Sequence, residues 1–231
     1  MKKILATTFL LLTLFSCNEK SKKNKVYLPT STGPVNVISI VIENDLWENE
    51  VGESIRTIFA APLVGLPQDE PLFQMTQIPP TAFKDKATKT RSVLKVTRGE
   101  QVSVELKENA FAKPQSMFEI TANSNDALIK MIKENADKMV DVFNKEEIKE
   151  RQYQIKKSLL NDFKMEENFG ISINIPSMFR MGKETENFYW IRRDLKAYKT
   201  MDLMIYEVPL DAVRPGDSAV IDIVKIRNKV I

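Results

Sequence analysis

The sequence contains no histidine, a single cysteine and only seven glycines. The absence of histidine excludes Ser-His-Asp and Cys-His catalysis, a histidine proton shuttle and imidazole metal ligands. One cysteine excludes an internal disulfide, a thiolate zinc cluster and a CxxC redox pair. The few glycines form no GxSxG, GxGxxG or Walker motif. No catalytic residue, cofactor or metal is therefore predicted.

The remaining composition is that of an ordinary folded protein. The 231 residues are 43% hydrophobic and 28% charged, which is enough to bury a real core. The formal net charge is +3 at pH 7, and it would fall to about +1 if a cleaved leader removed Lys2 and Lys3. A chain so close to neutral lacks the electrostatic footprint of a nucleic-acid-binding protein, and no nucleic-acid partner is predicted.

The N-terminus has the pattern of a bacterial lipoprotein signal. Two lysines precede the apolar run Ile4–Phe15, which is shorter than the roughly 20 residues of a membrane-spanning helix but fits a secretory signal. The only cysteine, Cys17, follows Leu-Phe-Ser, which resembles the lipobox read by lipoprotein signal peptidase. There the cysteine thiol receives diacylglycerol, cleavage follows Ser16, and the new amino group is acylated. Residues 1–16 are predicted as the signal peptide; the alternatives are an ordinary cleaved signal with an incidental cysteine, or a buried thiol in a core helix.

Residues 17–27 are polar and basic, and they are predicted as a flexible tether between the lipid on Cys17 and the folded domain. The acyl chains would hold the protein on a membrane at about 0.8 kcal/mol per buried methylene. Surface-exported lipoproteins commonly have acidic tethers, so this basic one favours the periplasmic face of the outer membrane. The cell surface is the alternative location.

Residues 28–231 are predicted as one α+β globular domain. The turn Arg98-Gly99-Glu100 lies between two strand patterns and indicates a β-hairpin. The runs with strand patterns are Val35–Ile42, Leu72–Ile78, Arg91–Thr97, Gln101–Leu106, Ser116–Thr121, Ile171–Ile175, Phe188–Leu195 and Met201–Val208.

The clearest helical pattern runs from Ser124 to Phe169, with Gly170 as its C-cap and a second capping pattern at Asn144. A shorter helix begins near Asp45. We therefore expect a mixed or antiparallel sheet packed against a long helical hairpin or bent helix. The two halves also share a strand-helix-strand outline that would fit a duplicated βαββ unit, with coincidence as the alternative.

Several phrases together resemble an uncharacterised lipoprotein family of Bacteroidota, catalogued as domain of unknown function number 4837. The resemblance implies an exported lipoprotein without known activity, and it spans roughly Leu28 to Leu210. Members of that family look considerably longer, which implies that this chain is C-terminally truncated. The phrases are Asn44–Trp47, Phe59–Phe73, Gln77–Pro80, Ala112–Gln115, Phe169–Ile171, Trp190–Asp194 and Ile205–Leu210.

Two segments are candidate partner-binding sites. Prolines restrict the loop Pro62–Pro71, which would display Gln68, Asp69 and Glu70 to a cationic partner or a hard cation. The alternative is a plain connector, because two carboxylates without a third oxygen donor are weak evidence for calcium.

The second candidate is the row Trp190, Arg192 and Asp194, which shares one face of a predicted strand. An exposed row of this kind would suit glycan or peptide contacts through stacking and bidentate hydrogen bonds. The alternative places Trp190 in the core and the charges at the end of the strand.

The leading expectation for function is a non-enzymatic envelope lipoprotein that faces the periplasm and binds or scaffolds an envelope protein or glycan. One alternative is a hydrolase that uses carboxylates on peptidoglycan or glycan, but 31 acidic residues leave no pair singled out. The other is a lipid-carrying module, which would need an enclosed apolar cavity.

Overall fold

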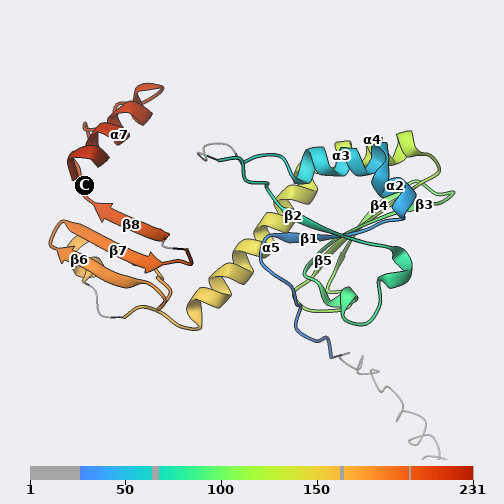
Figure 1. Ribbon diagram of the computed structural model, residues 1–231, viewed down its shortest axis with the longest axis horizontal. Coiled ribbons are helices and arrows are strands. Elements are labelled where there is room, and N and C mark those ends of the chain that lie inside the picture. The colour runs from blue at the N-terminus through green and yellow to red at the C-terminus, as the bar shows by residue number, and fades with distance from the viewer. Residues whose placement is uncertain (1–26, 64–67, 162–163, 198, 231) are drawn as a thin grey trace, which may run out of the picture. The chain divides into compact units, whose positions relative to one another are not determined.

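The computed structural model describes residues 27–63, 68–161, 164–197 and 199–230. These residues form helices and sheets, so the predicted α+β class is confirmed. They gather into two compact units that divide between Phe143 and Asn144, inside the long helix α5 (Figure 1). The part of the chain expected as one domain thus holds two units, each with its own core.

The first unit is built on a five-stranded mixed sheet with the strand order β2-β1-β3-β5-β4. All of its strands run parallel except β4, which pairs antiparallel with β5 at one edge. Its elements are β1 (Val37–Val41), α2 (Asn44–Glu48), α3 (Glu50–Phe59), β2 (Gln74–Ile78), the 3-10 turns Pro80–Ala82 and Ala87–Lys89, β3 (Ser92–Arg98), β4 (Ser103–Glu108), β5 (Ser116–Ala122), α4 (Asn125–Glu134) and the start of α5 (Ala136–Lys156).

Strand β1 lies inside this sheet, between β2 and β3. Its run of β-branched residues is buried on both faces: Ile38 and Ile40 contribute to the main core, while Val41 packs on the opposite side with Phe83. Strands covered on both faces have continuous apolar sequences of this kind. The strand predicted at Val35–Ile42 is confirmed for this reason.

The predicted hairpin between β3 and β4 is wrong, although both strands form. Strand β5 lies between them, parallel to β3 and antiparallel to β4. Burial explains the order, because β5 is mostly buried while β4 carries polar residues and stands at the edge. The insertion also places Glu119 on β5 between two lysines: Lys95 on β3 approaches to 3.2 Å, and Lys107 on β4 forms a short contact.

Helices α3, α4 and α5 cover one face of the first sheet (Figure 1). The core between them contains four packed phenylalanines that come from four different elements or their ends. Phe143 on α5 lies at the centre of this group, with its ring centroid 5.5 Å from that of Phe118 and about 6 Å from those of Phe59 and Phe73. All four side chains are fully buried.

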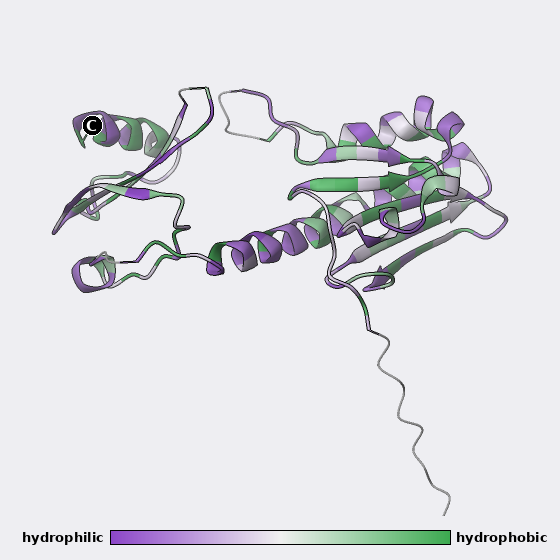
Figure 2. Cartoon of the chain, turned by 60° about the horizontal axis from the view of Figure 1, so that its bottom comes forward, coloured by the Kyte–Doolittle hydropathy of each residue, from purple (hydrophilic) through white to green (hydrophobic). Residues whose placement is uncertain are grey.

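The long helical region is bent, as the sequence predicts, but the break falls at Asn135 and not at Asn144. The predicted extent to Phe169 is wrong, because α5 ends at Lys156, residues 157–161 are not helical, and Met165–Phe169 form a separate helix. Helix α4 begins at a Ser124 cap whose hydroxyl oxygen accepts from the backbone N–H of Ala127. At the break, the side-chain amide of Asn135 donates to the Met131 carbonyl over 2.9 Å. Figure 2, in which hydrophilic residues are purple, shows the C-terminal part of α5 as mostly purple.

The second unit is smaller and contains a three-stranded antiparallel sheet with the order β6-β7-β8. Its core holds Met165, Ile175, Tyr189 and Ile191. Its elements, after the end of α5, are α6 (Met165–Phe169), β6 (Arg180–Thr185), β7 (Phe188–Asp194), β8 (Thr200–Tyr206) and α7 (Ser218–Val230).

Helix α6 is fastened to the middle strand of this sheet. The amide of Asn168 donates to the Tyr189 hydroxyl over 2.8 Å, and the Phe169 ring meets the Tyr189 ring edge-on at 5.2 Å. Burial raises the pKa of Tyr189 above its ordinary value, although the bond from Asn168 opposes the shift. Helix α6 ends at Gly170 in the left-handed conformation, with a φ of 66°, so the predicted C-cap is confirmed.

The strand predicted at Ile171–Ile175 is wrong. This segment alternates apolar and polar residues, but Ile171 and Ile173 are exposed, and only Ile175 enters the core. Its one backbone bridge joins Leu159 and Pro176. Alternation predicts a strand only where a partner is present, and here the described residues offer only that single bridge.

The duplication that the sequence outline suggested is not found in the described structure. Four parallel strands and one antiparallel edge strand make up the first sheet, whereas the second is a simple antiparallel meander. None of the helices in the described part of the chain has the length and apolar content needed to span a bilayer.

An ion pair holds the start of α7 to the turn before it. The backbone N–H and the Nε of Arg214 both donate to Oδ2 of Asp222, and Nη2 donates to Oδ1 over 2.8 Å. These bonds lower the pKa of Asp222 from 3.8 to about 2. Because the folded pKa is the lower one, the stabilisation is present above pH 3.8 and is lost as the pH falls toward 2.

This pair gives a direct titration test. The side-chain carboxyl carbon of Asp222, followed by NMR, is expected to titrate near pH 2, since the folded state holds the anion. In Arg214→Gln the pKa should move back toward 3.8, because the charge and the fork of donors are removed. The matched control is Arg227→Gln on α7, which should leave the Asp222 curve in place; an unchanged curve in Arg214→Gln would contradict the assignment.

Candidate binding site

Strand β7 alternates between a buried and an accessible face. Tyr189 and Ile191 are fully buried, while Trp190 and Arg192 are half-buried on the other side. This is the facial arrangement that the sequence predicts for the strand. The accessible face of the second sheet therefore carries the candidate row, and Trp190 is not in the core.

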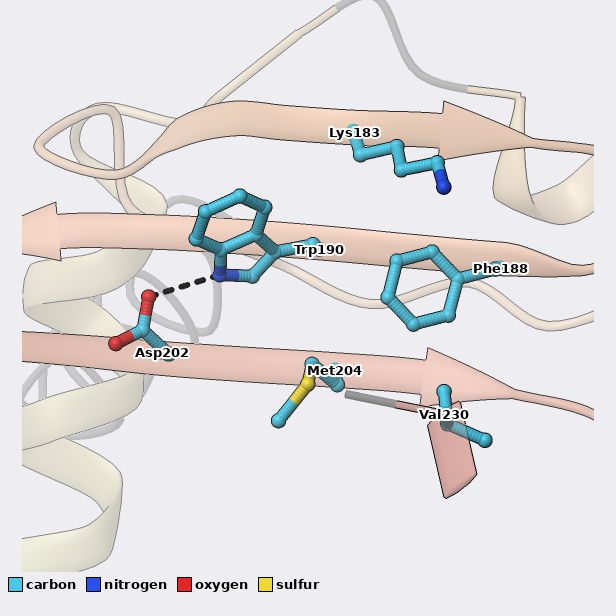
Figure 3. A pocket seen from close by; sticks show the side chains of 6 residues that line it. All are labelled: Lys183, Phe188, Trp190, Asp202, Met204 and Val230. Atoms are coloured by element: carbon cyan, nitrogen blue, oxygen red, sulfur yellow. Dashed lines mark hydrogen bonds between the residues drawn. The ribbon is translucent and has the colours of Figure 1, made fainter. Parts of the chain in front are cut away.

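Trp190 lies across the sheet and contacts both neighbouring strands, β6 and β8. Toward β6 it covers Gly182, where a Cβ atom would come within 2.9 Å of Cε3 and 3.0 Å of Cδ2 of the indole. Toward β8 its Nε1–H donates to Oδ1 of Asp202 over 2.8 Å, as Figure 3 shows. The ring thus rests on β6 at a residue that has no side chain, and the Asp202 carboxylate on β8 fixes its orientation.

We call the open hollow beside this ring the Trp190 groove; its volume is about 470 Å³. Figure 3 shows its lining side chains, with Phe188 beside Trp190 on β7 and Lys183 opposite Asp202 across the strands. The Lys183 ammonium lies 5.6 Å from the centre of the Phe188 ring, a cation–π distance. The six lining residues are Lys183, Phe188, Trp190, Asp202, Met204 and Val230.

Asp202 is held as an anion at the edge of this groove. Oδ1 accepts from Trp190 and Oδ2 from the Thr200 hydroxyl over 2.9 Å. The bonds from Trp190 and then Thr200, together with the positive charge of Arg192, lower the pKa of Asp202 below its ordinary value. The groove therefore combines an ammonium, a carboxylate and aromatic rings within one surface hollow.

Arg192 and Asp194, the other members of the predicted row, are largely engaged with each other. Arg192 Nε donates to Oδ1 of Asp194 over 3.3 Å, and Arg180 on β6 donates to Oδ2 over 3.0 Å. The Arg192 guanidinium lies 5.9 Å from the Trp190 ring. The three residues of the row thus lie close together, but only Trp190 lines the groove. Arg192 and Asp194 lie beside it.

Gln68, Asp69 and Glu70 lie in the first unit, whereas the Trp190 row lies in the second. All three are exposed, and the backbone beside them forms a short bridge between Pro62 and Pro71. Within the described residues, no group of three or more acidic or cysteine side chains is placed to hold a metal ion. Ser16 and Cys17, the predicted cleavage and lipidation positions, lie outside the described residues.

Sequence reasoning missed Gly182, Lys183, Phe188, Asp202 and Met204. Phe188 could have been found, because it lies two residues before Trp190 on the same strand and so shares its face. The others depend on strand register: Lys183 is opposite Trp190 on β6, and Met204 is opposite it on β8. No local pattern fixes that register.

These features define an α+β protein of two compact units with an aromatic groove on the second sheet. Residues 31–156 match the family described as domain of unknown function DUF8532. This match covers more than half of the chain, so the chain belongs to that family. No curated protein and no solved structure gives a significant match.

Residues 157–231 match a second family, described as domain of unknown function DUF4837. The predicted resemblance to domain of unknown function number 4837 is therefore confirmed for the second part of the chain. Its extent is corrected, because the match begins at residue 157 and not near Leu28. The phrases between Asn44 and Gln115 lie within the DUF8532 match.

Proposed function

We propose that this chain is a membrane-anchored envelope lipoprotein of the Bacteroidota type, lipidated on Cys17, that binds a partner through the Trp190 groove. The proposed location is the periplasmic face of the outer membrane, with the cell surface as the alternative. The observation that carries the proposal is the Trp190 ring, which is fixed on both sides and yet lines an accessible hollow. Aromatic anchors held in this way lose little entropy on binding.

The anchoring half of the proposal is supported by the sequence. The apolar run Ile4–Phe15 follows two lysines and ends directly before Ser16 and Cys17. The only cysteine of the chain thus stands at the one position where lipidation requires a thiol. Two or three acyl chains on one residue are sufficient for stable attachment to a bilayer.

Binding fits the groove better than hydrolysis does. A carboxylate hydrolase acting on glycosidic bonds needs one carboxyl whose pKa is raised so that it can donate a proton. At this site the pKa of Asp202 is lowered, and both oxygens of Asp194 accept from arginines. Asp202 in the groove and Asp194 beside it are therefore arranged as hydrogen-bond acceptors.

The test uses photo-crosslinking in intact cells of the source bacterium. A photoreactive phenylalanine analogue replaces Met204, which lines the groove, and the full chain keeps its signal. We expect a covalent adduct with one envelope component that disappears when Trp190→Ala is added. Cys17→Ala should remain as unlipidated precursor in radiolabelled-palmitate experiments and should weaken the adduct by removing the anchor.

The matched control places the same analogue at Met178, an exposed residue of the second unit that does not line the groove. It should give no Trp190-dependent adduct. If the Met204 adduct is absent, or persists in full after Trp190→Ala, the groove is not the binding surface. If Cys17→Ala still incorporates palmitate, the lipidation assignment is wrong.

A further inference from the structure

We infer that the ligand of the Trp190 groove is a glycan, with one pyranose ring stacked on the indole of Trp190. The inference rests on the proposed binding function and specifies its ligand class. Three properties of the groove support it: a flat aromatic platform, hydrogen-bonding groups on both rims, and the position of the hollow on the face of the sheet.

The platform is flat because Gly182 allows it. The indole lies down on β6 at a point where any side chain would collide with Cε3 and Cδ2. Phe188, two residues away on the same face, extends the aromatic surface and is itself stacked on Tyr206, with ring planes 24° apart. The C–H face of a pyranose carries partial positive charge, and it therefore suits the electron-rich face of an indole.

The rims supply the polar partners that hydroxyl groups require. Asp202 uses one oxygen for Trp190 and the other for Thr200, and each carboxylate oxygen retains a further lone pair for a sugar hydroxyl. Opposite it, the Lys183 ammonium has three N–H groups that can donate. A sugar hydroxyl both donates and accepts, so this pair of rims matches it.

The same features disfavour the other common ligands of aromatic grooves. A peptide strand would add to the free edge of a sheet, where backbone groups are unpaired, but this hollow lies on a sheet face. A nucleic acid strand would bring phosphates close to Asp202, which is ionised at neutral pH. The groove volume of about 470 Å³ lies within the roughly 300–1,000 Å³ range of small-molecule sites.

The chain offers a simple optical test, since it has only two tryptophans and one of them is Trp47 in the first unit. In the Trp47→Phe variant, all tryptophan emission comes from Trp190. We expect a saturable change in this emission on titration with triacetylchitotriose, maltotriose or mannotriose. Calorimetry on the full chain should then show that Trp190→Ala lowers the affinity by roughly tenfold or more.

Two further variants separate stacking from charge. Gly182→Ala displaces the indole from the sheet and should weaken binding of the trisaccharide while the far-UV circular dichroism is unchanged. Asp202→Asn keeps an acceptor for Trp190 and should weaken sugar binding only modestly. If the unsubstituted protein instead binds inorganic phosphate more tightly than any of the three trisaccharides, the groove selects anions and the glycan inference is wrong.

The outcomes distinguish this inference from the proposed function. Absence of binding for all three trisaccharides, together with a protease-sensitive adduct at Met204, would overturn the glycan inference and leave the binding function standing. A Met204 adduct that resists protease and is degraded by glycosidase would support both. Absence of sugar binding and of any Trp190-dependent adduct would overturn both.

Discussion

Replacing Phe143 with alanine is expected to lower the free energy of unfolding of the first unit by about 3–5 kcal/mol. The side chain is fully buried and meets Phe59, Phe73 and Phe118 with ring centroids 5.5–6.3 Å apart. Truncation therefore removes one ring from a group of four and leaves a cavity that helices on one side and strands on the other cannot easily close. Of the substitutions considered, we expect this one to have the largest effect.

Urea unfolding of the full chain in a Trp190→Phe background measures this loss, because the remaining Trp47 reports on the first unit alone. Lys138→Ala is the matched control: it lies on the same helix but is exposed, so its effect should stay within about 0.5 kcal/mol. A Phe143→Ala loss no larger than that of Lys138→Ala would show that α5 is not part of this core.

The second large effect is expected for Gly52→Ala, which should destabilise the first unit by about 3 kcal/mol. A Cβ atom at this position would lie 1.9 Å from the carbonyl oxygen of Trp47, inside any permitted contact distance. That oxygen belongs to the backbone and also accepts from Arg56 over 3.0 Å, so it cannot move aside freely. The junction between α2 and α3 would have to open.

The measurement is the same urea unfolding, with Trp47 emission as the local signal. Thr57→Ala on the exposed side of α3 is the control, and its better helix propensity should leave the stability unchanged or slightly higher. A neutral Gly52→Ala would mean that α2 and α3 adopt a different junction from the one described.

Local sequence patterns were sufficient to predict those features of the fold that depend only on residues within one helix, strand or turn. The β-branched run of β1 and the Gly170 cap each depend on neighbouring residues in the chain. The pairing of β3 was not predictable in this way. Its turn at Gly99 indicated a hairpin, but β5, made later in the chain, is the more buried strand and takes the position beside it.

In the candidate site, too, features set within one strand were predictable, and features set by pairing between strands were not. The face shared by Trp190 and Arg192 follows from alternation along one strand, whereas the role of Asp202 depends on how β8 pairs with β7. The sequence also does not reveal that Gly182 lies under the indole, since glycine in a strand has several possible causes. Register between strands is a property of the assembled sheet and has no local signal here.

The two family matches meet at residues 156 and 157, directly at the end of α5. The compact units divide thirteen residues earlier, after Phe143. The DUF8532 match therefore includes the whole of α5, although only its first part packs in the core of the first unit. The Trp190 groove lies entirely within the DUF4837 match.

The position of Phe143 has a consequence for synthesis of the protein, which proceeds from the N-terminus. The four parallel strands are complete at Ala122, yet the helix residues Leu128, Ile132, Met139 and Phe143 that cover them come only afterwards. Until α5 has left the ribosome, the nascent sheet would expose the part of its apolar face that α3 does not cover. The first unit is thus expected to stay unfolded, and open to chaperones or an export machinery, until about two-thirds of the chain has been made.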